Sequence, residues 1–254
     1  MLLCKKFIIC LLTTFSLTLY STAPENFKEN QKKYPRVQKA YGNKESGILE
    51  LLNKQSIEIS KLRIYLRAFK VESKIELWGK NQNETSFKLL KVYPVCRSSG
   101  ALGPKRVQGD RQIPEGFYHI TAFNPNSRFH LSMAINYPNK SDRILGHKDY
   151  PGNNICIHGG CLTIGCLPIT NDLIEELYIF CLEAKNNGQE KIPVTIFPAE
   201  LDRVKYEVLM AKHANDPDKT ALWKELKQCF DIFNKTKSLP KIQFLDTGRH
   251  RIIP

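Results

Sequence analysis

Alternating apolar and polar residues predict that the main folded region begins as a series of β-strands. Between Ile59 and Lys70, apolar side chains alternate with basic ones and Tyr65, the period of two that is typical of a half-buried strand. The next two runs, 74–80 and 86–95, flank a polar turn and are predicted to pair as a hairpin. Further strands are predicted at 117–123, 129–137, 155–158 and 193–198.

Helical periodicity appears in the second half of the chain. Thr170 or Asn171 is suited to cap the start of a helix whose apolar positions recur every three or four residues until Gly188 ends it. Two more helical stretches are predicted, at 201–213 and 219–234. Strands followed by helices in this proportion predict an α+β or mainly-β fold, with helices added to a β-rich core.

The predicted elements divide the chain after its N-terminus into three parts. Residues 24–57 are polar and lysine-rich with a weak helical pattern, so we expect a helical or linker segment there. The strands and the first strong helix fill 58–200, which we expect to be the principal domain. Residues 201–254 are expected to form a helical extension that ends in a basic, peripheral tail, in which His250 is solvated.

The first 23 residues have the parts of a secretory signal. Lys5 and Lys6 precede an uncharged run, Phe7 to Ala23, which ends in small residues. The run is also nearly as long as the roughly 20 apolar residues that span a bilayer. We therefore expect an exported protein of the periplasm or cell envelope, with the segment either cleaved or kept as an inner-membrane anchor.

Composition agrees with a globular exported protein and argues against one class of partner. Hydrophobic residues make up 42% and charged residues 25% of the 254 residues, ordinary values for a chain that buries a core. The formal net charge of +13 is scattered along the chain and suits contact with anionic polymers or lipid head groups. Zinc-finger, RNP and helix-turn-helix signatures are absent from the sequence, so no nucleic-acid partner is predicted.

The segment IHGGCLTIGC, residues 157–166, carries the candidate chemistry. It holds an imidazole, two thiols and three glycines, the groups that a thiolate nucleophile and its base require. Cys166 is predicted to be the nucleophile and His158 the group that accepts and returns its proton. Gly165 allows close approach of the backbone and is predicted to supply an N–H group to an oxyanion hole.

Other interpretations of the same residues remain open. Cys156, His158, Cys161 and Cys166 are all of a type that binds zinc, and four ligands are the norm for a structural zinc site. Cys156 and Cys161 are alternatively a local disulfide or two buried thiols. The sequence alone assigns no disulfide, and His158 by itself is equally compatible with a core histidine.

A set of segments between residues 64 and 198 resembles the L,D-transpeptidase catalytic-domain family of the YkuD type, and most closely its YafK-like branch. The resemblance implies a β-sandwich-like catalytic domain with added helices at 58–200. It also implies Cys166 as nucleophile, His158 as proton donor and acceptor, and Gly159 as the backbone group that orients the imidazole. Metal and organic cofactors are not implied. The segments with the strongest resemblance are 98–105, 109–118, 124–132, 135–139 and IHGGCLTIGC.

The family's activity defines the expected reaction. The thiolate would attack the carbonyl at the L-centre of meso-diaminopimelate in a peptidoglycan stem peptide, release D-alanine, and pass the acyl group from a thioester to an amine. Water as acceptor would make the protein a hydrolase, either a carboxypeptidase or an amidase that releases wall-linked protein. A non-catalytic zinc-binding module of the cell envelope is the alternative from another class.

Two departures from the commoner family pattern concern substrate choice. Ile164 stands where a polar residue or histidine usually precedes the Gly-Cys pair, and Leu167 and Pro168 replace a basic or amide residue after it. Both departures fit the YafK-like branch and leave the acyl acceptor open. Glycine-rich loops often hold binding groups, and the loop residues expected to contact the substrate are Lys105, Arg111, Gln112 and Tyr118.

Overall fold

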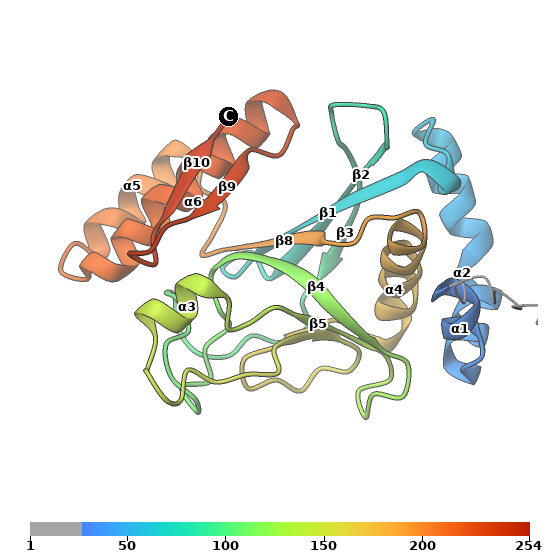
Figure 1. The fold of residues 1–254 in the computed structure, drawn as a ribbon, viewed down its shortest axis with the longest axis horizontal. Coiled ribbons are helices and arrows are strands. Elements are labelled where there is room, and N and C mark those ends of the chain that lie inside the picture. Colours follow the sequence, from blue (N-terminus) through green and yellow to red (C-terminus); the bar gives the residue numbers. More distant parts are fainter. Residues whose placement is uncertain (1–26) are drawn as a thin grey trace, which may run out of the picture.

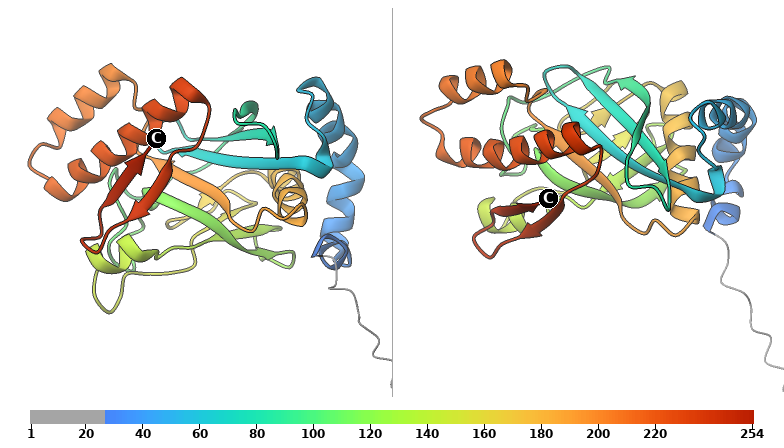
Figure 2. Two further views of the ribbon diagram at one scale, coloured as in Figure 1. Left: turned by 45° about the horizontal axis from the view of Figure 1, so that its top comes forward. Right: turned by 90° about the horizontal axis from the view of Figure 1, so that it is seen from above.

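The computed structural model describes residues 27–254, so the predicted signal segment, 1–23, lies outside the described residues. At its centre is one mixed sheet of eight strands in the order β3-β2-β1-β8-β4-β5-β6-β7. Helices lie against this sheet (Figures 1 and 2), and the α+β fold predicted from the sequence is confirmed. Within the described residues, none of the helices combines the length and the apolar character needed to cross a membrane.

The bounds of the elements are as follows. The strands are β1 (Leu62–Phe69), β2 (Lys74–Asn81), β3 (Lys88–Pro94), β4 (Gly116–Asn124), β5 (Ser132–Ile135), β6 (Cys156–His158), β7 (Leu167–Pro168), β8 (Ile192–Phe197), β9 (Lys241–Phe244) and β10 (His250–Ile253). The helices are α1 (Phe27–Lys32), α2 (Pro35–Lys54), α3 (Lys140–Leu145), α4 (Asn171–Asn186), α5 (Arg203–Lys212) and α6 (Pro217–Thr236), with a short 3₁₀ turn at Ile59–Lys61.

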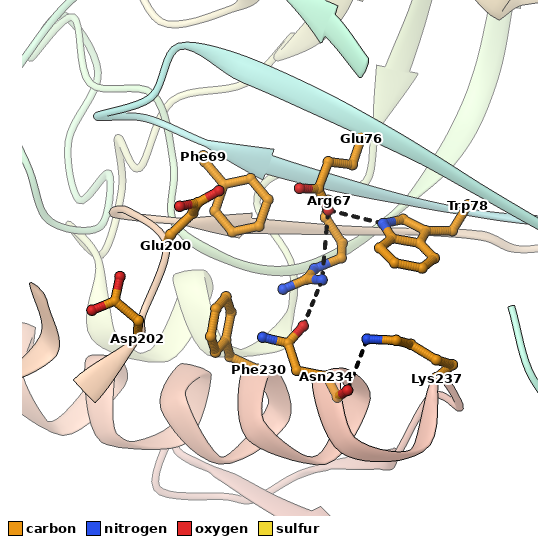
Figure 3. Close-up of a pocket in the computed structure, with 9 residues that line it drawn as sticks. All are labelled: Arg67, Phe69, Glu76, Trp78, Glu200, Asp202, Phe230, Asn234 and Lys237. Atoms are coloured by element: carbon orange, nitrogen blue, oxygen red, sulfur yellow. Dashed lines mark hydrogen bonds and ion pairs between the residues drawn. The ribbon is translucent and has the colours of Figure 1, made fainter. Parts of the chain in front are cut away.

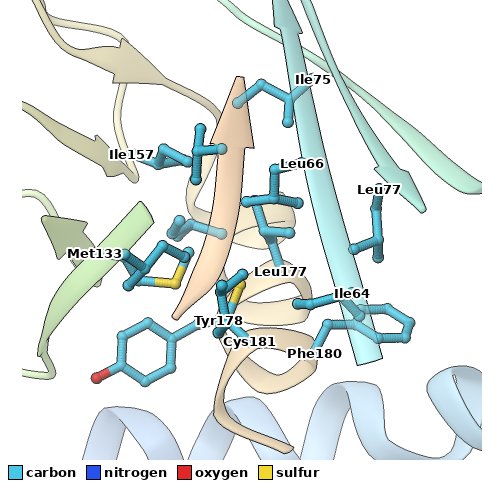
Figure 4. Packing of buried hydrophobic residues seen from close by; sticks show 14 of the residues in the cluster. Ile64, Leu66, Ile75, Leu77, Met133, Ile157, Leu177, Tyr178, Phe180 and Cys181 are labelled. Atoms are coloured by element: carbon cyan, nitrogen blue, oxygen red, sulfur yellow. The ribbon is translucent and has the colours of Figure 1, made fainter. Parts of the chain in front are cut away.

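The inner face of the sheet and α4 enclose the main hydrophobic core. Residues of β2, near one end of the sheet, and of β6, near the other, belong to the same buried cluster, which requires the sheet to curl around α4. Figure 4 shows Leu66, Met133 and Ile157 from three strands gathered with Leu177 of α4. This core supports β5 and β6 from behind and so fixes the strands that precede the IHGGCLTIGC segment.

The outer face of β1 is also buried, so the prediction of a half-buried strand was wrong. Tyr65 is fully buried and Arg67 is only 3% exposed, although both lie on the face expected to meet solvent. Phe233 of α6 packs edge-on against Tyr65 with ring centroids 5.1 Å apart. The alternation of residues within one strand depends only on that strand's own side chains. It cannot predict that α6, a helix far away in the sequence, covers the outer face.

Arg67 lines a cavity of about 440 Å³ between the sheet and α6 (Figure 3). Its Nη1 donates to Asn234 Oδ1 at 3.0 Å and lies 3.5 Å from Glu76 Oε2. The guanidinium also lies 4.9 Å from the ring centroid of Phe230. A nearly buried charge needs partners of this kind, and Arg67 therefore connects the sheet to the C-terminal helix.

Helices α1 and α2 lie beside α4 and contribute to the main core (Figure 1). Ile48 and Leu52 of α2 are each 1% exposed. The hydroxyl of Tyr41 donates to Glu183 Oε1 of α4 at 2.7 Å. The polar segment before the sheet is thus packed against it through α4.

The C-terminal tail is structured, and the expectation that His250 is solvated was wrong. Strands β9 and β10 form an antiparallel hairpin that packs with α6. His250, expected to be solvated, is 8% exposed and its Nδ1 lies 2.7 Å from Glu225 Oε2 of α6. Ser141 of α3 donates to the Gly248 carbonyl at 2.6 Å. Apolar and basic residues are interspersed over two strands of only four residues each, which gives too weak a pattern to predict a hairpin.

The other predicted strands and helices are present with shifted bounds. The strand expected at 129–137 is shortened to Ser132–Ile135, since His130 adopts a left-handed conformation (φ 70°) that interrupts an extended strand. The predicted hairpin of β2 and β3 is confirmed. The expected start of α4 is confirmed as well, with the Thr170 hydroxyl accepting a hydrogen bond from the Leu173 N–H.

Candidate active site

Three neighbouring strands bring the histidine and the thiols to one face of the sheet. β6 pairs antiparallel with β5 and parallel with the short β7, where Ile157 lies opposite Leu167. Side chains two residues apart on a strand point the same way, so Cys156 and His158 share a face. Cys166, one residue before Leu167, falls beside Cys156 by the same register.

The segment 159–166 connects these two parallel strands as a tight loop. Gly165 has φ 135°, and a Cβ there would lie 2.9 Å from the Gln112 carbonyl oxygen, so only glycine fits. Cys161, near the middle of the loop, is joined to Cys96 by a disulfide. The loop that carries Cys166 is therefore fixed at two points, by the close contact of Gly165 with the Gln112 backbone and by the Cys96–Cys161 disulfide.

His158 is held in one orientation. It is 2% exposed, and its Nδ1 lies 2.7 Å from the carbonyl oxygen of Gly159. A carbonyl can only accept, so Nδ1 carries the proton and Nε2 is left as the basic nitrogen when the ring is neutral. The ring of Phe129 stacks on the imidazole with centroids 4.5 Å apart. The Gly159 carbonyl thus occupies the orienting position expected from the sequence.

The environment of Cys166 favours its thiolate. Its Sγ accepts a hydrogen bond from the Cys156 N–H at 3.4 Å. The hydrogen bond with the Cys156 side chain lowers the pKa of Cys166 most, burial opposes this, and contact with His158 lowers that pKa further. Burial alone would lower the pKa of His158, but contact with Cys166 and the bond to Gly159 outweigh it and raise that pKa. The two groups therefore tend toward a thiolate–imidazolium pair.

The expected oxyanion-hole donor is already engaged. The N–H groups of Gly165 and Cys166 both donate to Thr163 Oγ1, at 3.2 and 2.9 Å. The Thr163 hydroxyl in turn donates to the Cys166 carbonyl at 2.8 Å. In this conformation the Gly165 N–H is not free to bind an oxyanion, because the threonine three residues before the cysteine closes a local turn around it.

A cavity of about 880 Å³ opens in front of the pair. Its size lies within the roughly 300–1,000 Å³ common for ligand pockets. Two of the four predicted substrate residues line it, Lys105 and Arg111. Lys105 is 4% exposed and its ammonium is paired with Asp110, so its charge is largely neutralised. Arg111 is exposed and has no carboxylate partner within residues 27–254.

The other two predicted substrate residues, Gln112 and Tyr118, do not line this cavity. The Gln112 side chain instead holds the neighbouring loop, with its Nε2 donating to the Gly103 carbonyl at 3.2 Å. Tyr118 is 5% exposed, and its hydroxyl lies 3.3 Å from the Asp142 carboxylate. Both residues lie in a segment that resembles the family, yet their side chains pack within the protein and do not line the cavity.

Sequence reasoning missed two cavity residues and one neighbour of the nucleophile. Arg128 lines the cavity and its guanidinium lies 4.9 Å from the ring centroid of Phe129, which itself stacks on His158. Both residues occur in NPNSRFHLS, one of the segments that resemble the family, and that resemblance was the available signal. Cys156 was considered as a zinc ligand, a disulfide partner or a buried thiol, although its position two residues before His158 placed it on the same strand face.

The structure does not form the alternative zinc site. Cys161 is bonded to Cys96, which removes it from the expected set of four ligands and also excludes a Cys156–Cys161 disulfide. Across the described part of the chain, no group of three or more histidine, cysteine or acidic side chains is arranged to hold a metal ion. Cys156 and Cys166 are free thiols, each partly exposed.

A cysteine beside an oriented histidine at the wall of an open cavity is the arrangement of enzymes that use a thiolate nucleophile. Residues 68–196 match the family of the L,D-transpeptidase catalytic domain (YkuD). Over 189 residues the chain is 34% identical to the Escherichia coli K12 protein "Putative L,D-transpeptidase YafK", spanning 74% of this chain and 72% of that protein. The chain therefore belongs to the L,D-transpeptidase catalytic-domain family, whose members act on peptidoglycan.

Solved structures that superpose in part on this chain include two bacterial proteins. The helical cell shape determining protein Pgp2 from Campylobacter jejuni superposes with a TM-score of 0.43 at 17% identity, over 73% of this chain and 74% of that one. Bd1075 from Bdellovibrio bacteriovorus gives a TM-score of 0.39 at 19% identity, over 71% and 76% of the two chains.

Proposed function

We propose that this protein is an exported, cysteine-dependent L,D-transpeptidase that acts on meso-diaminopimelate-containing stem peptides of peptidoglycan. The observation that carries the proposal is the contact between Cys166 and His158 at the wall of the 880 Å³ cavity. Family membership supports the substrate class. Export rests on the N-terminal segment of the sequence, and localisation to the periplasm or cell envelope is part of the proposal.

The reaction follows from the protonation states of the pair. The Cys166 thiolate attacks the carbonyl carbon at the L-centre of the diaminopimelyl residue, and the imidazolium of His158 protonates the leaving amine of D-alanine as its C–N bond breaks. A thioester remains on Cys166. An incoming amine then attacks the thioester, His158 accepts its proton, and the thiolate is released with a new amide bond formed.

Two unpaired guanidinium groups support an anionic peptide as substrate. Arg111 and Arg128 both line the cavity and are exposed, and neither has a carboxylate partner within the described residues. Stem peptides carry several carboxylates, and guanidinium groups bind carboxylates with two parallel hydrogen bonds. We assign Arg111 and Arg128 to binding of the substrate carboxylates. Lys105 also lines the cavity, but its charge is neutralised by Asp110.

Water as the acceptor would make the same site a hydrolase. The cavity is open and the thiol is partly exposed, so water reaches the position that an acceptor amine would take. Exposed Ile164, 78% accessible, and Leu162, 66% accessible, form an apolar rim beside the thiol where a larger acceptor would dock. Product analysis separates the two outcomes.

The proposal is tested by incubating the purified protein with a disaccharide-tetrapeptide and following products by mass spectrometry. We expect an acyl-enzyme adduct on Cys166 with loss of D-alanine, and then either a cross-linked dimer or a tripeptide. Cys166→Ala is expected to abolish both adduct and products. Cys181→Ala is the matched control, because that thiol is fully buried on α4 and its removal leaves the cavity unchanged. An adduct that persists in Cys166→Ala would overturn the assignment of the nucleophile.

A further inference from the structure

Cys156 is the second free thiol of the site and has no part in the reaction described above. The sulfur atoms of Cys156 and Cys166 each lie 3.7 Å from the carbonyl oxygen of Asn154, so both thiols crowd around one acceptor. The Cys156 N–H also donates to Cys166 Sγ at 3.4 Å. The parallel register of β6 and β7 explains this juxtaposition, since Cys156 and Cys166 stand one residue before the paired Ile157 and Leu167.

We propose that Cys156 is a positioning residue that donates its S–H to the Cys166 thiolate, and thereby keeps the nucleophile ionised and aimed at the cavity. The inference rests on the proposed function for its catalytic meaning. The donor geometry itself is independent of the substrate. Cys-X-X-Cys motifs likewise place a second thiol near a cysteine of lowered pKa, and here two strands supply the pair instead.

The surroundings decide which of the two sulfurs is the thiolate. Cys166 is the one that contacts the imidazole of His158 and receives the backbone N–H. Cys156 has only the Asn154 carbonyl and Cys166 itself as partners for its sulfur, and both accept. The same contact that lowers the pKa of Cys166 raises that of Cys156, as expected when the latter keeps its proton to donate.

Other charged groups face this pair from the cavity walls. They are Lys105, Arg111 and Arg128, of which Lys105 is paired with Asp110. Between pH 4 and 9, titration at this site reports His158 and Cys166, because Cys156 keeps its proton throughout.

The proposal is tested by the pH dependence of Cys166 alkylation with iodoacetamide in the full chain, resolved by tandem mass spectrometry of the peptide. We expect wild-type Cys166 to react at an apparent pKa well below the roughly 8.5 of a free thiol. Cys156→Ala removes the donor, so the profile should move to higher pH by at least one unit. At a pH well below both apparent pKa values, that corresponds to an alkylation rate about tenfold slower, since each pKa unit is there a factor of ten in thiolate.

Cys156→Ser keeps a donor of similar size and is expected to retain most of the low-pH reactivity. This rescue separates donation from packing, because a purely structural role would leave the profiles of both variants alike. Thermal unfolding confirms that each variant is folded. A Cys156→Ala profile that superimposes on wild type, equal shifts for alanine and serine, or Cys156 as the thiol that reacts at low pH would each overturn the proposal.

The outcome is distinguishable from failure of the proposed function. If stem peptides give no product but Cys156→Ala still shifts the alkylation profile, the donor role stands and the substrate is wrong. If products form at an unchanged rate and the profile does not move, the donor role is wrong and the reaction stands.

Discussion

The orientation of His158 depends on a glycine at position 159, where even one added methyl group would not fit. Gly159 lies against the start of α4, where an added Cβ would be 2.7 Å from Asn171 Oδ1, 2.7 Å from the Phe129 carbonyl oxygen and 2.9 Å from Ile174. Two of these neighbours belong to a helix that is packed into the core. The Gly159 carbonyl accepts a hydrogen bond from His158 Nδ1, so a shift of this backbone would also shift the imidazole.

Gly159→Ala is expected to cost about 1–3 kcal/mol of stability through overpacking and to reduce activity by displacing His158. Gly160→Ala is the matched control, because a Cβ there meets nothing closer than 3.9 Å and only the left-handed φ of 75° opposes it. That strain costs roughly 1–2 kcal/mol without touching the imidazole. Thermal unfolding and turnover of both variants check this; equal turnover in the two would show that the Gly159 contact does not orient the base.

Some features of the active-site residues could be predicted from the sequence alone and others could not. Cys166, His158 and Gly159 fall within one short segment, so local chemistry was enough to predict their neighbourhood. The engagement of the Gly165 N–H by Thr163 depends on the exact path of the loop, and that path is set partly by Cys96, 65 residues away in sequence. Such a remote constraint leaves no trace in the local pattern.

At the scale of elements, the loop between β6 and β7 is held by a disulfide to the segment after β3. Cys96 and Cys161 are bonded, and the Cys96 N–H also donates to the Pro168 carbonyl of β7 at 3.0 Å. A covalent link and a backbone hydrogen bond thus tie one short segment to the active-site loop and to β7, the strand that follows it. The disulfide is expected to matter for the position of Cys166 as well as for stability.

Cys161→Ser is expected to lower the free energy of unfolding by about 4 kcal/mol, the entropic value for a loop of this length. Cys96→Ser should cost the same, and the double variant no more than either, because a single bond is lost in all three. Denaturant unfolding measures this. Additive losses in the double variant would contradict a shared bond, and wild type in reductant should reproduce the single variants.

At the scale of the whole molecule, the sheet is covered on both faces by segments distant in sequence. α4 and α2 lie on one side, and α6 with the β9–β10 hairpin on the other. The sequence predicted most of these strands and helices, but could not say which face each helix covers. The buried outer face of β1 and the buried His250 were missed for that reason, since their coverage comes from residues after 200.

Substitution of Phe233 tests how firmly α6 is packed against the outer face of the sheet. It is fully buried, with its ring 5.0 Å from Trp78 and 5.1 Å from Tyr65. Phe233→Ala is expected to cost about 3–5 kcal/mol and to preserve a single cooperative transition, with Phe233→Leu costing less. A separate early transition for 201–254, followed by circular dichroism during thermal unfolding, would show instead that the C-terminal elements unfold independently of the sheet.

The register of β6 and β7 has a consequence for oxidative chemistry. Opposed positions on neighbouring strands are about 4.8 Å apart, within the Cα separation that a disulfide requires. With hydrogen peroxide, the Cys166 thiolate would take up one oxygen and the imidazolium of His158 would give a proton, so that a sulfenic acid forms and water is released. The Cys156 thiol would then displace a second water to close a Cys156–Cys166 disulfide. We expect peroxide to abolish activity reversibly in wild type, with recovery in dithiothreitol. Cys156→Ser should instead proceed to the irreversible sulfinic acid, which mass spectrometry detects as a gain of two oxygens on Cys166.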